Sequence, residues 1–438
     1  MEVPVREWTH WVTGYGLSRV SLRLMARRGD PLAQLLSIDS KPVRDIYPLV
    51  ERVRERGRMS PVQGAGWVSA DARIVREVLR DGRFRTLKQR DRSPFRIGQW
   101  ILAKTDPYVL NLLEPPSMLV TDPPDHTRLR RLVSRSFTPR ALDGLRARVH
   151  EVADDLLRGL DGRAECDLIA EYTTRIPIAV IAEMLAIPRD EISYLFAVSE
   201  WITSLIGNAA ASWKDFHTAT KALLGFDRYL AEHIERVRRG DAADSILSDV
   251  VHNGDLTQVE NKLLAGLVLG AGFVTTTHVL GKAVVALLRH PDQLAALRAN
   301  REGWPNAVEE ILRYDTTGQL AGRVATESVD IQGYSVQAGE TIFLLVGGAN
   351  RDPAVFERPD VFDTTRANAR EHISFGFGVH ACLGAALARM ELHIGLQSLF
   401  ERFPQLALAG DPAYNGSIGL HGLTHLPVSL RGGSVVAS

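Results

Sequence analysis

One segment constrains the fold more than any other, because it reads as a single apolar helix of about thirty residues, roughly 50 Å long. Thr257 and Glu260 form a capping box at its start, and His290-Pro291 ends it. Its middle, LLAGLVLGAGFVTTTH (residues 263–278), contains three glycines and three consecutive threonines. Both residue types disfavour a helix interior. A run of them inside an apolar core helix indicates a functional constraint.

The rest of the chain is also mostly helical in pattern. From about residue 120 to 320, apolar residues recur at three- and four-residue spacing with short breaks. Between 324 and 347 they alternate and are separated by glycine turns, which predicts a small sheet. Helical spacing returns at 383–400. The sequence therefore predicts a mainly α fold with a minor β part.

Composition excludes several classes of protein. Lys+Arg and Asp+Glu both number 52, so no global basic field attracts nucleic acid. We find no run of about 20 purely apolar residues and expect no transmembrane segment. Only Cys166 and Cys382 are present, which excludes a disulfide framework and fits a reducing cytoplasm. The length of 438 residues would by itself suggest two or three domains.

The N-terminal region differs from this balanced average. Over residues 1–58, cations outnumber acids, and Trp8 and Trp11 lie among them. This combination is compatible with binding at a membrane surface. We expect instead a helix that packs on the body of the protein.

The strongest chemical signal is FGFGVHACLG, residues 375–384. Cys382 stands just before a predicted helix, where free N–H groups and the helix dipole are expected to lower the pKa of a thiol. Gly376 and Gly378 allow a tight turn around the sulfur. Thiolate is one of the few protein ligands that hold haem iron. Cys166 has no such surroundings, and we interpret it as a buried structural cysteine.

At this point the sequence resembles the cytochrome P450 family in its bacterial form. The resemblance extends from about residue 45 to 430 and includes DPPDHTRLRRLVSRSFTPR, AGxxTT, EEILR, RVATE, ANRDPAVF and the cysteine loop, in the order found in the family. It implies one P450 domain over 1–438, with 1–44 as an N-terminal extension packed on the body. It also implies haem b (heme b, iron protoporphyrin IX), held by the thiolate of Cys382 between the long central helix and the helix after the cysteine.

The resemblance assigns roles to further residues. His126 and Arg130 are four residues apart and share a helix face; the family pattern places both at a haem propionate, together with Arg323 and His380. Phe375 begins the cysteine loop and is assigned to cofactor binding. Two more pairs complete the expected site: Glu310 with Arg313 as a structural ion pair, and Thr275 with Thr276 as catalytic hydroxyls beside bound O2.

Three arginines on the His126 helix point away from the expected haem edge. At 100° per residue, Arg128, Arg131 and Arg135 lie on the opposite side from His126 and form a basic stripe. A charged stripe is often only a solvated face. By family analogy, this one lies where an acidic ferredoxin or flavodoxin docks, which would carry electrons from an NAD(P)H-dependent reductase.

One position departs from the family pattern. The residue before Thr275 is usually an acid that relays protons, and here it is Val274. Protons could then pass through a water chain at the two threonines or through the substrate itself, and His278 is a conceivable substitute. The departure also leaves open a peroxide-using or oxidative-coupling enzyme.

Three functions remain to be distinguished. The first is a monooxygenase acting on a mid-sized, largely apolar organic molecule, the second is the peroxide-using or coupling enzyme, and the third is a non-catalytic haem protein that binds a ligand. By analogy the substrate pocket involves four segments: 85–118, 195–225, 268–276 and 315–322. Five large side chains in or near these segments are candidates for its lining: Trp100, Trp201, Ile206, Phe273 and Leu320.

Overall fold

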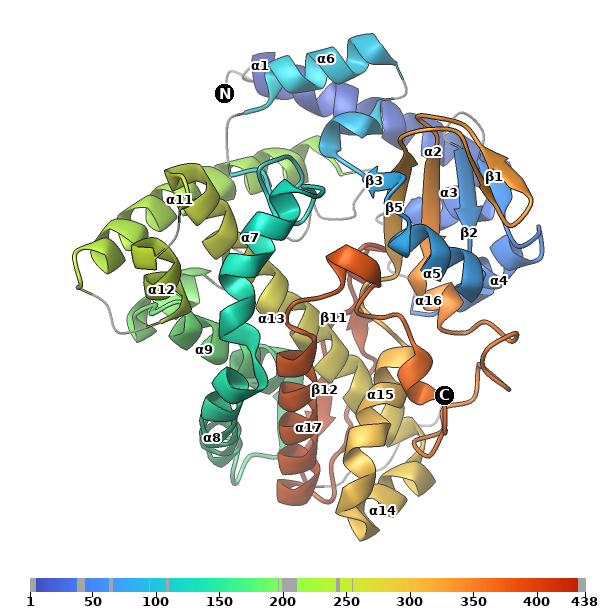
Figure 1. The fold of residues 1–438 in the computed structure, drawn as a ribbon. Coiled ribbons are helices and arrows are strands. Elements are labelled where there is room, and N and C mark those ends of the chain that lie inside the picture. The colour runs from blue at the N-terminus through green and yellow to red at the C-terminus, as the bar shows by residue number, and fades with distance from the viewer. Residues whose placement is uncertain are drawn as a thin grey trace.

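The computed structural model describes residues 5–37, 44–62, 66–93, 95–107, 110–195, 197–198, 211–241, 245–253 and 255–431. Helices dominate this part of the chain (Figure 1). The α-helices are α1 Val5–Trp11, α2 Leu17–Arg27, α3 Pro31–Leu36, α4 Tyr47–Arg54, α5 Ala72–Arg80, α6 Arg96–Thr105, α7 Asp125–Ser134, α8 Pro139–Arg158, α9 Arg175–Met184, α11 Trp213–Arg238, α12 Ile246–Asn253, α13 Gln258–Arg289, α14 Pro291–Ala299, α15 Trp304–Tyr314, α16 Val346–Ala349 and α17 Ala385–Arg402. The mainly α prediction is confirmed.

The predicted long helix is α13, and it passes through the middle of the molecule (Figure 1). The Thr257 hydroxyl accepts from the amide of Glu260, the Glu260 carboxylate accepts from the amide of Thr257, and the helix ends before His290, as predicted. Helices α9, α11, α15 and α17 pack around it. Their apolar side chains form the largest hydrophobic core, so α13 organises the whole helical part.

The expectation about membrane spans needs one correction. By length and composition, α13 is apolar enough to cross a membrane, and it is the only such helix in the described ranges. However, 78% of its most apolar window is buried inside the protein. Its hydrophobicity is therefore explained by its place in the core.

A five-stranded sheet lies beside the helical part, with the order β1-β2-β8-β5-β3 (Figure 1). Strands β2 and β8 are parallel, and the other neighbours are antiparallel. Its strands are β1 Ser60–Val62, β2 Gly66–Ser69, β3 Phe84–Thr86, β5 Leu320–Ala325 and β8 Thr341–Leu345. Between β5 and β8, β6 Val329–Ile331 and β7 Tyr334–Val336 form a hairpin. The sheet predicted near 324–347 is therefore confirmed, but its other strands come from residues 60–86.

Two small sheets tie the C-terminal region to the helices. Their strands are β4 Glu165–Asp167, β9 Ala407–Leu408, β10 Ala413–Tyr414, β11 Leu423–His425 and β12 Pro427–Ser429. Cys166 lies on β4 opposite Val428 and is buried, and its burial raises the pKa of the thiol to about 11. These surroundings agree with a structural cysteine.

The N-terminal helices contact α6 and α11. Helix α1, the π-helical turn η1 (Val12–Gly16) and α2 follow one another, and α1 contacts both α6 and α11. The Trp11 indole donates to the carbonyl of Ala211 at 3.0 Å, and Glu7 lies 2.8 Å from the ring nitrogen Nδ1 of His217. Tyr15 is buried against Phe216. The extension is therefore attached by polar and aromatic contacts.

Candidate active site

The cysteine loop connects the sheet region to α17. The amide of Cys382 donates to the carbonyl of Phe375 at 2.7 Å, which closes the loop. Gly376 and Gly378 have φ values of +69° and +72°, a conformation that other residues rarely adopt. A Cβ at Gly378 would also lie 2.5 Å from the carbonyl oxygen of Leu79 on α5. The two glycines therefore let the loop turn tightly and lie directly against a helix.

The Cys382 thiol lies in a hollow, because it is enclosed by protein and yet accessible to a small molecule. Burial raises the pKa of this thiol, although the amide of Gly384 and the charges of Arg130 and Arg389 act in the opposite direction. The expectation that the helix start alone would lower the pKa is therefore wrong. A bound metal ion would supply the charge that deprotonates the thiol.

Helix α7 brings its predicted residues to the cysteine loop. The rings of His126 and His380 are 4.3 Å apart, and Arg130 lies close enough to act on the Cys382 thiol. His126 is buried, and burial together with the charges of His380 and Arg130 lowers its pKa to about 4. The Nε2 atom of His380 is buried without a hydrogen bond, and its nearest acid is Asp122 at 3.7 Å.

Arg323 on β5 is the second cation of this site, besides Arg130. Its side chain is buried, its guanidinium donates to the carbonyl of Gly322, and burial lowers its pKa. Neither Arg323 nor Arg130 has a carboxylate within 4.0 Å in the described part of the chain. Buried charges are normally paired. An unpaired buried cation near an accessible thiol fits haem, whose two propionates carry the complementary charge.

Asp122 belongs to the same surroundings and was not predicted. It accepts from the amide of Thr86 at 2.9 Å and lies 3.6 Å from Lys88. Burial raises its pKa, but the contacts with His380, Thr86 and Lys88 outweigh burial and hold the pKa at about 2. The DPPDH motif contains this acid, but only the fold brings it to His380.

On α13, a short accessible stretch interrupts an otherwise buried helix. Ala271 is exposed, Thr275 is half-buried, and no atom lies within 4 Å of a Cβ built on Gly270. The Thr275 hydroxyl donates to the carbonyl of Ala271 at 2.8 Å, and the Thr276 hydroxyl to that of Gly272 at 3.2 Å. The two hydroxyls keep their lone pairs, so the accessible hydroxyl of Thr275 can accept a hydrogen bond from a water molecule.

Two other glycines of α13 lie against neighbouring side chains. A Cβ at Gly272 would lie 2.6 Å from Ile181 of α9, and one at Gly266 would lie 2.8 Å from Leu110. These two glycines allow close packing of neighbouring side chains. Gly270 alone faces open space. Val274 is buried in the main hydrophobic core, so the residue that replaces the usual acid is a core residue.

His278 does not replace the missing acid in the described geometry. It packs against Gly422, and its Nε2 atom lies 3.4 Å from the Asn415 side chain. Burial and the charges of Lys282 and His421 lower its pKa to about 3. The ring is therefore neutral at physiological pH.

Glu391 is a buried acid that the sequence analysis missed. It lies on α17, is 1% exposed, and its carboxyl interacts with the Thr276 hydroxyl. Burial raises its pKa to about 8, which the Thr276 contact only partly offsets. Its Oε1 atom has no hydrogen-bond partner. A protonated carboxyl thus contacts one of the predicted catalytic hydroxyls; no local pattern connects residues 276 and 391.

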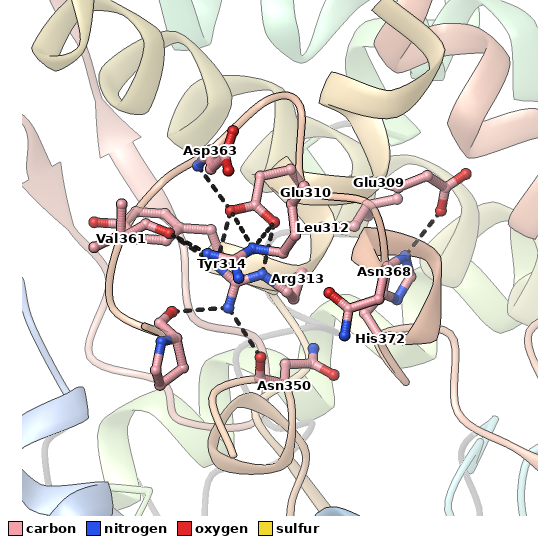
Figure 2. A network of polar contacts seen from close by, with 12 residues as sticks. Glu309, Glu310, Leu312, Arg313, Tyr314, Asn350, Val361, Asp363, Asn368 and His372 are labelled. Carbon is pink, nitrogen blue, oxygen red and sulfur yellow. Dashed lines mark hydrogen bonds and ion pairs between the residues drawn. The ribbon is translucent and has the colours of Figure 1, made fainter. Parts of the chain in front are cut away.

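Glu310 and Arg313 form a fully buried, bidentate ion pair on α15, with N–O distances of 2.6 and 2.8 Å (Figure 2). The Arg313 guanidinium also donates to the carbonyls of Asn350, Pro359 and Val361. Glu310 accepts in addition from the amide of Asp363 and from Arg366. In addition to their mutual ion pair, both charged groups are therefore hydrogen-bonded to residues of the segment 350–366.

Asn350 extends this network to the cysteine loop. Its side chain accepts from the amide of Ile373 and donates to Ser374, whose hydroxyl donates to the carbonyl of Leu312. Glu309, which was not singled out in the sequence, makes a second link. Its carboxylate contacts His372 at 3.0 Å (Figure 2) and Arg389 of α17 at 2.7 Å. Helix α15 thus fixes both ends of the segment that carries the cysteine.

The predicted basic stripe on α7 is only partly present. Arg131 and Arg135 are exposed. Arg128 instead forms an ion pair with Glu260, the capping-box residue of α13. The reason is that α13 begins beside α7, which the helical spacing of α7 alone does not reveal.

A cavity of about 1240 Å³ lies between the N-terminal helices and the sheet. Arg323, Leu320 and the residues from Arg85 to Gln89 line it, in agreement with two of the four expected segments. Leu17, Leu22 and Met25 of α2 line its other side, which was not expected. Two of the five candidate lining residues lie elsewhere, since Trp100 is on the outer surface of α6 and Phe273 is in the core. Two others, Trp201 and Ile206, are outside the described residues.

Comparison with known proteins agrees with this site. The sequence model of the family described as cytochrome P450 matches residues 304–412. The putative cytochrome P450 140 of Mycobacterium tuberculosis is 36% identical over 433 residues, which covers 97% of this chain and 98% of that protein. The chain therefore belongs to the cytochrome P450 family, whose members are haem-thiolate monooxygenases.

Solved structures give the same answer for the fold. The ligand-free CYP164A2 of Mycobacterium smegmatis matches with a TM-score of 0.81 and 33% identity, covering 91% of this chain and 99% of that one. P450BioI, solved with an acyl carrier protein ligated to hexadec-9Z-enoic acid, matches with a TM-score of 0.78 and 30% identity, covering 88% and 98%. The P450 fold and the haem-thiolate cofactor predicted from the sequence are thus confirmed.

Proposed function

We propose that this P450 inserts one oxygen atom from O2 into a mid-sized, largely apolar organic molecule, in the cytoplasm. The observation that carries the proposal is the accessible thiol of Cys382 in a hollow beside the unpaired cations Arg130 and Arg323. The apolar lining by Leu17, Leu22 and other side chains supports an apolar substrate.

The Cys382 thiolate would hold the haem iron, and haem bound there would supply the binding and reduction of O2. The chain's own residues hold it: Arg130, Arg323, His126 and His380 offer positive charge and N–H donors to the two propionates. Phe375 at the start of the loop is itself fixed by Arg389, which lies 4.5 Å from the centre of its ring. Glu310 and Arg313 act as structural residues that keep this loop in place.

Protons reach the hollow through hydroxyls in this proposal. Thr275 holds a water molecule, and Thr276 connects the hollow to the protonated carboxyl of Glu391. Since Val274 and His278 offer no titratable group near neutral pH, Glu391 is the remaining proton donor that contacts the threonine pair. A positioned proton donor contributes about 10²–10⁴ in rate.

Electrons come from NAD(P)H through a reductase and a separate ferredoxin or flavodoxin. Arg131 on α7 and Arg135 in the turn that follows this helix are exposed and support docking of an acidic carrier. The burial of Val274 in the core favours a second candidate, an enzyme driven by peroxide, which needs fewer delivered protons. A comparison of turnover by reduced carrier with turnover by peroxide alone distinguishes the two.

Cys382→Ser tests the ligand assignment, with Cys166→Ser as the matched control. The reduced, CO-bound protein should show the red-shifted Soret band of a thiolate haem, and Cys382→Ser should abolish it because a hydroxyl does not supply the same electron density. Cys166→Ser should retain it. A band that survives in Cys382→Ser contradicts the assignment. The same band, monitored with a panel of apolar compounds, also detects substrate binding, and no spin-state response in any of them would favour a non-catalytic haem protein.

A further inference from the structure

Large apolar side chains gather on the outer surface of the N-terminal helices and α6. Eight of the fifteen large hydrophobic side chains that are exposed in the described ranges lie here. We call these eight the apolar ridge: Val5, Trp8, Leu17, Val20, Leu24, Phe95, Ile97 and Trp100. Large apolar side chains that gather in one region of a protein surface mark an interaction site.

The ridge is organised by helix geometry. On α2, Leu17, Val20 and Leu24 fall within an arc of about 60° and point outward, and no residue of this helix is fully buried. On α6, Ile97 and Trp100 form a second outward stripe. Helix α6 packs against α1 and η1, so both stripes lie at the same end of the molecule (Figure 1).

The charge around the ridge is mostly positive. The segments 5–28 and 95–105 contain seven cations and one acid, Glu7, which already contacts His217. The seven cations are Arg6, Arg19, Arg23, Arg27, Arg28, Arg96 and Lys104. Arg23, Arg27 and Arg28 flank the α2 stripe and have no carboxylate within 4.0 Å in the part of the chain that the structure describes. Apolar side chains between unpaired arginines, with tryptophans beside them, match the interface of an anionic bilayer.

The ridge also borders the mouth of the cavity. Leu17 is 64% exposed and Phe95 is 70% exposed, yet both line the cavity of about 1240 Å³. Any surface that covers the ridge therefore meets the cavity opening. A second copy of the chain would bring seven cations against seven, which opposes association. An acidic protein would satisfy the cations but would leave much of the apolar surface without a matching partner.

We propose that α1, α2 and α6 seat this protein on the surface of an anionic lipid bilayer, with the cavity mouth facing the lipid. The arginines contact lipid phosphates, while the apolar ridge enters the boundary between headgroups and acyl chains. Binding of the bilayer does not depend on the proposed oxygenation. A substrate dissolved in the lipid would enter from this side, and that part does rest on the proposed function.

Co-sedimentation of the haem-loaded protein with vesicles tests the proposal. Vesicles of phosphatidylcholine with phosphatidylglycerol should bind the protein at low salt, and pure phosphatidylcholine should bind it at least about tenfold more weakly. Val20→Ser with Leu24→Ser, and separately Arg23→Gln with Arg27→Gln, should each weaken binding at least about tenfold. All four side chains are solvent-exposed, so the fold should persist; an unchanged CO-bound Soret band checks this.

Matched controls are available elsewhere on the surface. Leu224→Ser with Val259→Ser removes equally exposed apolar residues, and Arg158→Gln with Arg301→Gln removes exposed arginines. Both controls should bind vesicles like the wild type. No vesicle binding at low salt, or equal loss in the controls, overturns the proposal. So does a concentration-dependent dimer without lipid that Val20→Ser with Leu24→Ser abolishes, and so does capture by an acidic carrier protein without vesicle binding.

Discussion

Two regions with charged side chains adjoin the cysteine loop. They differ in whether these charges are paired within the protein. Around α15, Glu309, Glu310 and Arg313 each have several partners, and their charges cancel within the protein. In the haem site proposed above, Arg323 is buried without a carboxylate within 4.0 Å in the described ranges, and the buried Nε2 atom of His380 has no hydrogen bond. Charged groups that find all their partners within the protein hold a backbone in place. Charged groups that lack a partner mark where the charge of a ligand belongs. The comparison therefore distinguishes residues that support the cysteine loop from residues that bind a ligand.

Removal of one charge from the buried network around α15 should have the largest effect on stability. Glu310→Gln leaves the buried guanidinium of Arg313 without its charge partner, and we expect a loss of about 3–5 kcal/mol in the free energy of unfolding. Urea unfolding of the purified protein measures it. Arg158→Ala, which removes an exposed partner of Asp155, should leave the urea midpoint nearly unchanged. Equal losses in the two variants would remove the special role of the buried pair.

Glu391 extends the comparison to the pH dependence of the free energy of unfolding. Its pKa is raised in the folded state to about 8, so the folded protein retains a proton that the unfolded chain releases. This contribution to stability is complete below the unfolded pKa of about 4.3 and is lost as pH rises through about 8. Glu391→Gln lacks this slope and should gain on the order of 5 kcal/mol over wild type between these limits. Urea midpoints of both proteins across that range test this; parallel curves would contradict it.

Arg323→Ala should affect the cofactor more than the fold. Because no acid loses its partner, the free energy of unfolding of the apoprotein should change by less than about 1 kcal/mol. Haem retention should fall about tenfold, since a charge-assisted hydrogen bond to a propionate is lost. Transfer of haem to a scavenging apoprotein measures retention. Arg85→Ala on the neighbouring strand removes a cation that is already paired with Asp91 and should retain haem normally.

The smallest structural effect is expected on the outer face of α7. Arg131→Glu with Arg135→Glu should leave haem content and stability unchanged, because both side chains are exposed. Reduction by a ferredoxin should slow several-fold at low salt and converge with wild type at high salt, where rim charges are screened. A wild-type reduction rate at low ionic strength would exclude this face as the docking site.

The sequence predicts those features whose determinants are local. The α13 capping box, the Glu310–Arg313 spacing and the turn at the cysteine are each contained in a few consecutive residues. The contact of Glu391 with Thr276, the Asp122 contact with His380 and the packing of Gly272 on Ile181 each join distant segments. Gly272 illustrates this, because the sequence pattern of α13 does not report which neighbour packs on each face of the helix. The contribution of α2 to the large cavity was missed for a similar reason, since α2 lies outside the region of family resemblance.

The partners of Arg313 have a consequence for sequence divergence. In the segment 350–366, this guanidinium contacts the backbone carbonyls of Asn350, Pro359 and Val361. Every amino acid carries such an oxygen, so substitution at 359 or 361 leaves the acceptor in place. An insertion or deletion of a single residue shifts these acceptors relative to one another. Positions 359 and 361 are therefore constrained in their spacing more than in their side chains, and tolerate substitutions but few changes of register.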